Sequence, residues 1–237
     1  MKKNIYAKRK AEIILALDVE NMQRAGYFVN KLYPRVKIFK IGSVLFTAYG
    51  PKIVKRVQKK GAQVFLDLKF FDIPNTVACA VRQATRLGVK MLTLHIAGGE
   101  EMLVAAVRAA KEESRLLGTK RPLLIGVTVL TSKQAGAGEV LRLAKAGMAC
   151  GLDGVVCSAQ EAALLRKKIR RGFVIVTPGI RPDGASADDQ KRTATVSQAI
   201  EAGSDFLVIG RPILKAADPL DAAKKMRNIG RRTWQSR

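Results

Sequence analysis

The sequence of 237 residues has few of the residue types that mark metal-binding or disulfide-stabilised proteins. It contains one histidine, His95, and three cysteines, Cys79, Cys150 and Cys157, which form no CxxC pair. An odd number of cysteines suits reduced thiols in a cytoplasm, and we interpret all three as packing residues. A structural zinc site would need more histidines or paired cysteines, so we expect no metal.

Long hydrophobic runs are also absent. The apolar run at 13–17, which follows the basic segment 1–10, is too short for a signal-peptide core and ends at Asp18. A charged fraction of 26% argues against a membrane protein. Because no linker rich in proline or serine divides the chain, we expect one cytoplasmic domain, residues 1–237, with solvated basic tails at about 1–10 and 228–237.

Acidic residues are scarce beside basic ones. The chain has 19 Asp and Glu against 43 Lys and Arg, a formal charge of +24 that would attract any anion, from a small phosphate to nucleic acid. A basic nucleic-acid-binding protein is therefore one alternative, and it predicts binding that falls steeply with salt. Yet the basic residues are scattered, aromatic residues make up only 5%, and no zinc-finger or RNP-type pattern is present. We interpret the charge as a surface bias and expect no nucleic-acid partner.

Short apolar runs alternate with segments of helical spacing, a pattern typical of repeated βα units. The eight runs lie at 13–17, 36–41, 63–68, 91–95, 123–129, 154–157, 174–177 and 206–209. Apolar residues three and four apart predict helices between them, for example at 77–87, 102–117 and 159–169. Eight regularly spaced units favour an α/β fold with one closed (β/α)8 barrel over an open doubly wound sheet.

Polar residues cluster where these predicted strands end. The positions are Asp18, Lys40, Asp67, Lys69, His95, Thr131, Ser158, Gly210 and Arg211. In a parallel barrel the carboxyl ends of all strands share one face, which carries the active site. The sequence therefore predicts a polar site on that face.

The densest polar segment is DLKFFDIPNT, residues 67–76. In a strand, Asp67 and Lys69 project on the same side, and a buried Lys beside a carboxylate would be electrically paired. Pro74 suits the first turn of a helix, which places Asp72 in the preceding loop. The alternative is a surface salt bridge followed by a helix cap.

Four further segments join this one in a recognisable order. They are Ala16-Leu17-Asp18, Lys40-Ile41-Gly42, TPGIRP at 177–182 and IGRP at 209–212. From about residue 11 to residue 215, the chain resembles the bacterial orotidine 5'-phosphate decarboxylase family. The resemblance implies conversion of orotidine 5'-phosphate to uridine 5'-phosphate, the last step of de novo pyrimidine biosynthesis, without a cofactor.

The resemblance also implies a role for each site residue. Lys40, Asp67, Lys69 and Asp72 would form an alternating charge array, with Lys69 as the proton donor. Asp72 would reach into the partner's site, which implies a homodimer with shared active sites. The implied substrate-binding residues are Asp18, Lys40, Asp67, Ile73, Thr76, Thr131, Arg181, Gln190, Gly210 and Arg211. Asp18 and Lys40 would hold the ribose, and the last four residues would bind the phosphate and order a lid.

The chemistry of this reaction is consistent with such an array. Loss of carbon dioxide from the pyrimidine leaves a carbanion in the ring plane, which a fixed ammonium can stabilise and then protonate. One opposite charge at about 4 Å contributes roughly 4 kcal/mol, whereas demanding enzymes supply up to about 23 kcal/mol. Lys69 alone is therefore insufficient. Binding energy at the phosphate must contribute by closing a loop, for which 181–197 is the natural lid.

An enzymatic alternative comes from the same superfamily. Ketogulonate-phosphate decarboxylase and hexulose-phosphate synthase share the DxKxxD motif but use magnesium, so a magnesium-dependent sugar-phosphate decarboxylase or aldolase is possible. Those relatives carry Glu where this chain has Lys40, and a cation there would repel a divalent metal. His95, near Gly98 and Gly99, is interpreted as a structural residue rather than a catalytic one.

Overall fold

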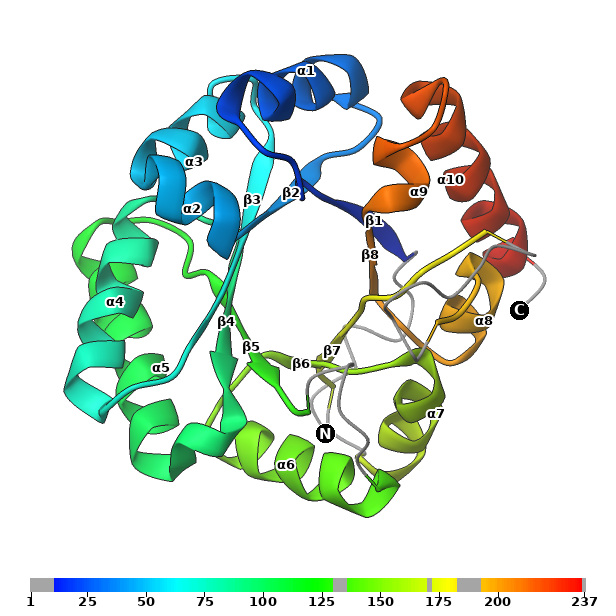
Figure 1. Ribbon diagram of the computed structural model, residues 1–237. Helices are drawn as coiled ribbons and strands as arrows, with labels where there is room; N and C mark the ends of the chain where they lie inside the picture. Colours follow the sequence, from blue (N-terminus) through cyan, green and yellow to red (C-terminus); the bar gives the residue numbers. More distant parts are fainter. Residues whose placement is uncertain (1–10, 130–135, 170–171, 183–192, 236–237) are drawn as a thin grey trace.

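The fold is a closed barrel of parallel strands surrounded by helices (Figure 1). The computed structural model describes residues 11–129, 136–169, 172–182 and 193–235. The strands are β1 (Glu12–Ala16), β2 (Ile38–Gly42), β3 (Gln63–Phe70), β4 (Met91–His95), β5 (Leu123–Val127), β6 (Gly154–Val156), β7 (Val174–Thr177) and β8 (Phe206–Ile209). They pair in sequence order, and β8 pairs with β1. The predicted (β/α)8 barrel is confirmed.

Helices follow the strands and cover the outside of the barrel. They are α1 (Met22–Leu32), α2 (Ser43–Tyr49), α3 (Pro51–Gln58), α4 (Pro74–Arg86), η1 (Ile96–Gly98), α5 (Gly99–Leu116), α6 (Ala137–Ala149), α7 (Ala159–Lys168), α8 (Val196–Glu201), α9 (Arg211–Leu214) and α10 (Pro219–Gln235). Pro74 occupies the first turn of α4, as the sequence predicted. None of the helices in the described part of the chain combines the length and apolar character that a membrane span requires.

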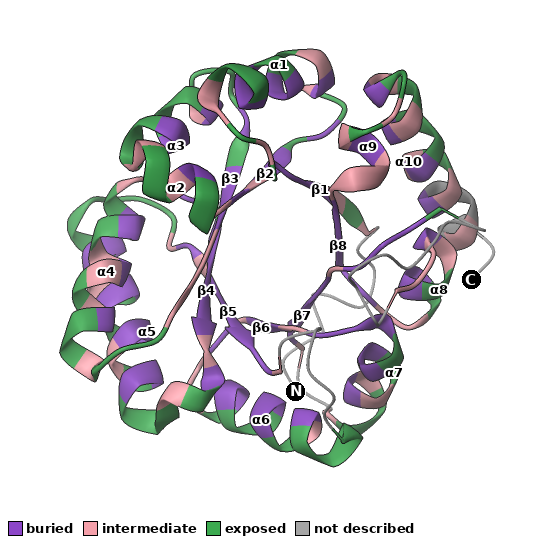
Figure 2. Ribbon diagram, in the orientation of Figure 1, coloured by how far each residue is buried: buried purple, intermediate pink, exposed green. Residues whose placement is uncertain are grey.

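Apolar side chains fill two separate layers. Successive residues of a strand face opposite sides, so Ile14 points into the barrel while Leu15 packs against the helices. The strands are therefore buried on both faces, as parallel strands usually are, and Figure 2 shows the exposed residues on the outward surfaces of the helices. The inner layer consists of Ile14, Ala16, Ile38, Phe65, Met91, Ile125, Val174, Val176, Phe206 and Val208.

The cysteines are only partly packing residues. All three are free thiols, and Cys157 is buried in the core, as expected. Cys79 is exposed on α4, so the interpretation of that residue as a packing residue is wrong. The reason is its position on the outward side of α4, whose buried residues include Val77 and Val81.

Two partly buried ion pairs fasten the strands at the end of the barrel opposite the predicted site. Arg121 pairs with Asp153, whose carboxylate also accepts the N–H of Leu124 at 2.8 Å. Arg166 pairs with Asp205, whose carboxylate accepts the N–H of Ile175 at 2.7 Å. Because Asp153 and Asp205 immediately precede β6 and β8, these contacts stabilise the amino ends of the strands.

The pairing of β3 with β4 is irregular at the motif that the sequence singled out. Phe65 and Leu66 pair with Met91 and Leu92, but the next pair is Phe70 with Leu94, so four steps along β3 match two steps along β4. Lys69 lies in this bulge with a φ of 52°, in the left-handed region that non-glycine residues rarely adopt. Simple strand alternation is therefore the wrong geometry for Lys69, although its predicted contact with Asp67 is present.

Close packing of β6 against β7 leaves no room for a side chain at Gly154. A Cβ atom there would lie 2.3 Å from the carbonyl oxygen of Val174. We expect Gly154→Ala to lower the free energy of unfolding by about 1–3 kcal/mol, because backbone atoms must move. Gly138→Ala on the exposed face of α6 makes the same chemical change with no atom within 4 Å, and should stabilise by about 0.5–1 kcal/mol. Urea unfolding of both variants checks this, and equal stabilities would contradict it.

Candidate active site

Four charged side chains of alternating sign meet at the carboxyl ends of β1, β2 and β3. The ammonium of Lys40 lies 3.2 Å from Oδ1 of Asp18 and 3.5 Å from Oδ2 of Asp67. The ammonium of Lys69 lies 2.9 Å from Oδ1 of Asp67. We call Asp18, Lys40, Asp67 and Lys69 the ionic array. Its two inner members are largely buried, with 12% of the Lys40 side chain and 13% of the Asp67 side chain exposed, so it is not a surface salt bridge.

The charge on Asp67 is maintained by its neighbours. Burial by itself would raise the pKa of the Asp67 carboxyl, but the charges of Lys40 and Lys69 lower it, as do hydrogen bonds from Lys69 and Thr93. The balance of these effects holds the pKa below its ordinary value. Asp67 is therefore an anion at neutral pH, held against two cations in a place with little water.

Thr93 is a site residue that the sequence reading missed. It is fully buried in β4, where its hydroxyl donates to Oδ1 of Asp67 at 3.0 Å and accepts the N–H of Lys69 at 2.8 Å. A signal was available, because Thr93 lies two residues after the inward-facing Met91 in the run MLTLH. Residues two apart on a strand share a face, so a hydroxyl inside the barrel could have been inferred.

A cavity of about 540 Å³ opens beside the ionic array. Asp67 and Lys69 line it from β3, and the segments after β7 and β8, across the closed barrel from β3, line it with Arg181, Gly210 and Arg211. Lys215, which the sequence reading also missed, lines the same side. Barrel enzymes commonly bind phosphate with the loops after the seventh and eighth strands, and guanidinium groups suit that ligand. The cavity thus has an ionic end of mixed charge and a cationic end.

Gly210, at the end of β8, lies beside β1 but has room for a small side chain. A Cβ at Gly210 would lie 3.5 Å from Cβ of Ala16 and 3.6 Å from Oδ2 of Asp18. Arg181 is buried, and its Nη1 donates to the carbonyl of Ile180 at 3.0 Å. Packing therefore holds Arg181 in place at the cationic end of the cavity.

Three predicted site residues, the catalytic Asp72 and the substrate-binding Ile73 and Thr76, lie apart from this cavity within the single chain. Asp72, Ile73 and Thr76 are exposed at the start of α4, and none of them lines the 540 Å³ cavity. Oδ1 of Asp72 accepts the N–H of Ile73 at 2.6 Å, and among the described residues Asp72 forms no ion pair. Thr131, Gln190 and residues 183–192 of the proposed lid lie outside the described residues.

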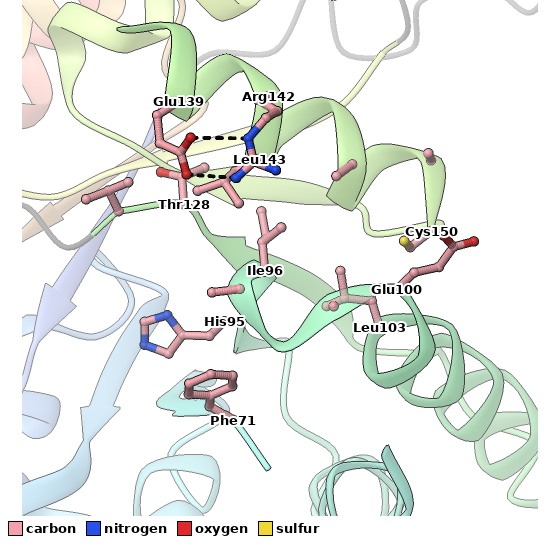
Figure 3. Close-up of a pocket in the computed structure, with 15 residues that line it drawn as sticks. Phe71, His95, Ile96, Glu100, Leu103, Thr128, Glu139, Arg142, Leu143 and Cys150 are labelled. Carbon is pink, nitrogen blue, oxygen red and sulfur yellow. Dashed lines mark hydrogen bonds and ion pairs between the residues drawn. The ribbon is translucent and has the colours of Figure 1, made fainter. Parts of the chain in front are cut away.

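A second hollow, of about 770 Å³, lies on the same side of the barrel between the segments that follow β4 and β5 (Figure 3). His95 lines this hollow and not the 540 Å³ cavity, and its ring lies 5.6 Å from that of Phe71. Glu139 and Arg142 form an ion pair at its far side, as Figure 3 shows. His95 is thus outside the ionic array. Ser158, another polar residue that the sequence placed at a strand end, is the N-cap of α7.

Metal ligands do not gather in the described part of the chain, where no group of three or more His, Cys, Asp or Glu side chains is placed to hold an ion. Both oxygens of Asp67 are already engaged by ammonium groups, Oδ1 by Lys69 and Oδ2 by Lys40. The site that the residues build is therefore one of fixed organic charges.

The fold and the site define a (β/α)8-barrel protein with an ionic cavity at the carboxyl ends of its strands. Residues 11–226 match the family model described as "Orotidine 5'-phosphate decarboxylase / HUMPS family". The chain belongs to this family, which confirms the resemblance seen in the sequence.

Relatives and solved structures agree with the family match. A protein from Vibrio atlanticus named "Orotidine 5'-phosphate decarboxylase" is 51% identical over 219 residues, which cover 88% of this chain and 93% of the relative. A protein of the same name from Coxiella burnetii is 48% identical over 226 residues, covering 91% and 94%. The crystal structure of orotidine 5'-phosphate decarboxylase from Lactobacillus acidophilus matches with a TM-score of 0.82 and 34% identity, covering 93% of this chain and 99% of that one.

Proposed function

We propose that this protein decarboxylates orotidine 5'-phosphate to uridine 5'-phosphate, the last step of de novo pyrimidine biosynthesis, in the cytoplasm and without a metal or organic cofactor. The observation that carries the proposal is the ionic array, with Lys40 and Asp67 largely buried, at one end of a cavity whose other end is cationic. A nucleotide with a reacting ring at one end and a phosphate at the other matches this distribution of charge. The names of the relatives support the same substrate.

The array offers a way to break the carbon–carbon bond and replace the lost group. The anionic Asp67 would repel a substrate carboxylate placed beside it, and the ammonium of Lys69 would stabilise negative charge on the ring carbon. The bond breaks with its electron pair left on that carbon, and carbon dioxide departs. A proton from Nζ of Lys69 then bonds to the carbon, and water later reprotonates the amine.

The cationic end would supply binding energy remote from the reaction. Arg181 and Arg211, with Lys215 beside them, would hold the phosphate, and Asp18 with Lys40 would hold the ribose. Thr131 and Gln190 would complete the contacts to the base and the phosphate. Energy from these groups accelerates the reaction when it is used to order the site in the transition state.

The magnesium-dependent alternative fits the site less well. A sugar-phosphate decarboxylase or aldolase of the same superfamily would need carboxylate oxygens open to a divalent cation. Here Lys40 lies between Asp18 and Asp67, at 3.2 Å and 3.5 Å from their oxygens. A divalent ion at Asp67 would have to displace one of two ammonium groups, which favours the metal-free reaction.

We further propose that two chains form a homodimer with shared sites. Asp72 is exposed and forms no ion pair among the described residues. If it lay beside the array, its carboxylate would be attracted to the ammonium groups of Lys40 and Lys69, so within one chain it is out of reach of them. Phe71 and Ile73 next to it, and Val44 beside the array, are large apolar residues that are also exposed. Burial of such residues against a second copy is the simplest way to remove them from water. Asp72 and Thr76 of the partner subunit would then complete each site.

The reaction is tested by an ultraviolet assay of purified protein with orotidine 5'-phosphate in EDTA. We expect full turnover in chelator, because the array supplies ammonium groups where metal-using relatives place part of a carboxylate cluster. Lys69→Ala should reduce kcat by at least about 1,000-fold while uridine 5'-phosphate still binds, since the ammonium acts on charge that develops in the transition state.

Lys52→Ala, an exposed lysine of α3, is the matched control and should keep wild-type activity. A strict requirement for magnesium would overturn the metal-free proposal. Substantial turnover by Lys69→Ala would assign the proton donor to another residue.

The phosphate site is tested with Arg211→Ala. We expect kcat/KM for orotidine 5'-phosphate to fall by about 100-fold or more, because a guanidinium contact to phosphate is lost. The wild-type protein should use orotidine very poorly, and Arg211→Ala should change that residual activity little. Arg108→Ala, on the exposed face of α5, is the control. Equal use of orotidine and its phosphate by the wild-type protein would contradict the proposed role of phosphate binding in the reaction.

Shared sites are tested by mixing two inactive variants. Lys69→Ala and Asp72→Asn homodimers should each be nearly inactive. After joint unfolding and refolding, about half of the dimers are mixed, and one of the two sites in each mixed dimer carries neither defect. Activity should therefore return to roughly a quarter of the wild-type level. If subunits exchange but activity stays at the level of the separate variants, Asp72 acts within its own chain.

A further inference from the structure

Thr93 contacts two members of the ionic array, Asp67 and Lys69, through one hydroxyl. Its Oγ1 accepts the backbone N–H of Lys69 at 2.8 Å and donates to Oδ1 of Asp67 at 3.0 Å. The direction of both hydrogen bonds is unambiguous, because an amide N–H can only donate and an ionised carboxylate can only accept. The side chain is fully buried, so water cannot replace either contact cheaply.

The backbone of Lys69 needs such a contact. Its φ of 52° is a conformation that costs about 1–3 kcal/mol for a residue with a side chain and persists only where the surroundings enforce it. Lys69 also lies where the β3–β4 register shifts, between the paired residues Leu66 and Phe70. The hydroxyl of Thr93, supplied from β4, gives the Lys69 N–H an acceptor within this bulge.

The same conformation directs the ammonium of Lys69. Strand alternation alone would not produce the observed backbone, yet the Lys69 ammonium lies 2.9 Å from Asp67 and lines the 540 Å³ cavity. Oδ1 of Asp67 receives both the Lys69 ammonium and the Thr93 hydroxyl. One threonine thus contacts the backbone of the cation and the carboxylate that pairs with it.

We infer that Thr93 is a positioning residue for the proposed decarboxylation: it holds Lys69 in its left-handed backbone conformation and so aims the ammonium at the reacting carbon. The inference rests on the proposed function. It adds to that function a residue of β4 that does not touch the substrate. A misplacement of a catalytic group by about 1 Å can cost on the order of 100-fold in rate, so a lost hydrogen bond here should affect kcat strongly.

The test compares Thr93→Val, which removes the hydroxyl and keeps the shape, with Thr93→Ser, which keeps the hydroxyl. We expect kcat of Thr93→Val to fall by about 10- to 100-fold while KM changes by less than about threefold, because the phosphate end of the cavity is untouched. Thr93→Ser should retain kcat within about threefold. Thr85→Val is the matched control, because Thr85 is also buried and donates to a backbone carbonyl, that of Val81, far from the site. It should leave both constants unchanged.

Several outcomes would overturn the inference. They are an unchanged kcat in Thr93→Val, a loss expressed only in KM, and an equal loss in Thr93→Ser. If Thr93→Val does not fold, Thr93→Ala against Thr93→Ser decides the question, since these two variants differ by one oxygen atom.

A crystal structure of Thr93→Val separates this inference from the proposed function. We expect Lys69 to leave its left-handed conformation or its ammonium to leave hydrogen-bond distance of Asp67. An unchanged Lys69 would refute the positioning role, whatever reaction the protein catalyses. Failure of the wild-type protein to use orotidine 5'-phosphate would refute the proposed function alone.

Discussion

The site depends on one interaction, the pairing of the buried Asp67 carboxylate with two ammonium groups. A buried carboxylate without partners would take up a proton, because burial penalises the charged form. Lys40 and Lys69 reverse that tendency and keep Asp67 ionised. The lysines depend on Asp67 equally, since two cations so close together would otherwise repel one another. The charge state of each of these three side chains therefore depends on the other two.

The barrel separates this electrostatic arrangement from the contacts that stabilise the fold. The ion pairs Arg121–Asp153 and Arg166–Asp205 fasten the amino ends of strands, where each carboxylate also accepts a backbone N–H. The opposite face carries the bulge, the left-handed Lys69 and the largely buried charges of Lys40 and Asp67, all of which cost free energy. A closed barrel can tolerate that cost because its strands are buried in apolar layers on both faces.

The large positive charge of the chain would attract an anionic substrate, but it does not account for the recognition of one particular anion. A net charge of +24 raises the local concentration of any anion, including a nucleotide, and this effect weakens as salt increases. Specific recognition must come from the few cations that line the cavity, Arg181, Arg211 and Lys215 at one end and the two lysines of the array at the other.

The sequence by itself determined the barrel and most of the site, because both follow from local periodicity and from the rule that parallel strands end on one face. Eight apolar runs gave the strands, and Met91–His95, Val174–Thr177 and Phe206–Ile209 have the bounds expected. Tertiary structure alone decided the bulge at Lys69 and its contact with Thr93, because both depend on how β3 pairs with β4. It also decided that Lys215 lines the cavity and that Asp72 lies outside it, since neighbours distant in the chain set the position of each side chain.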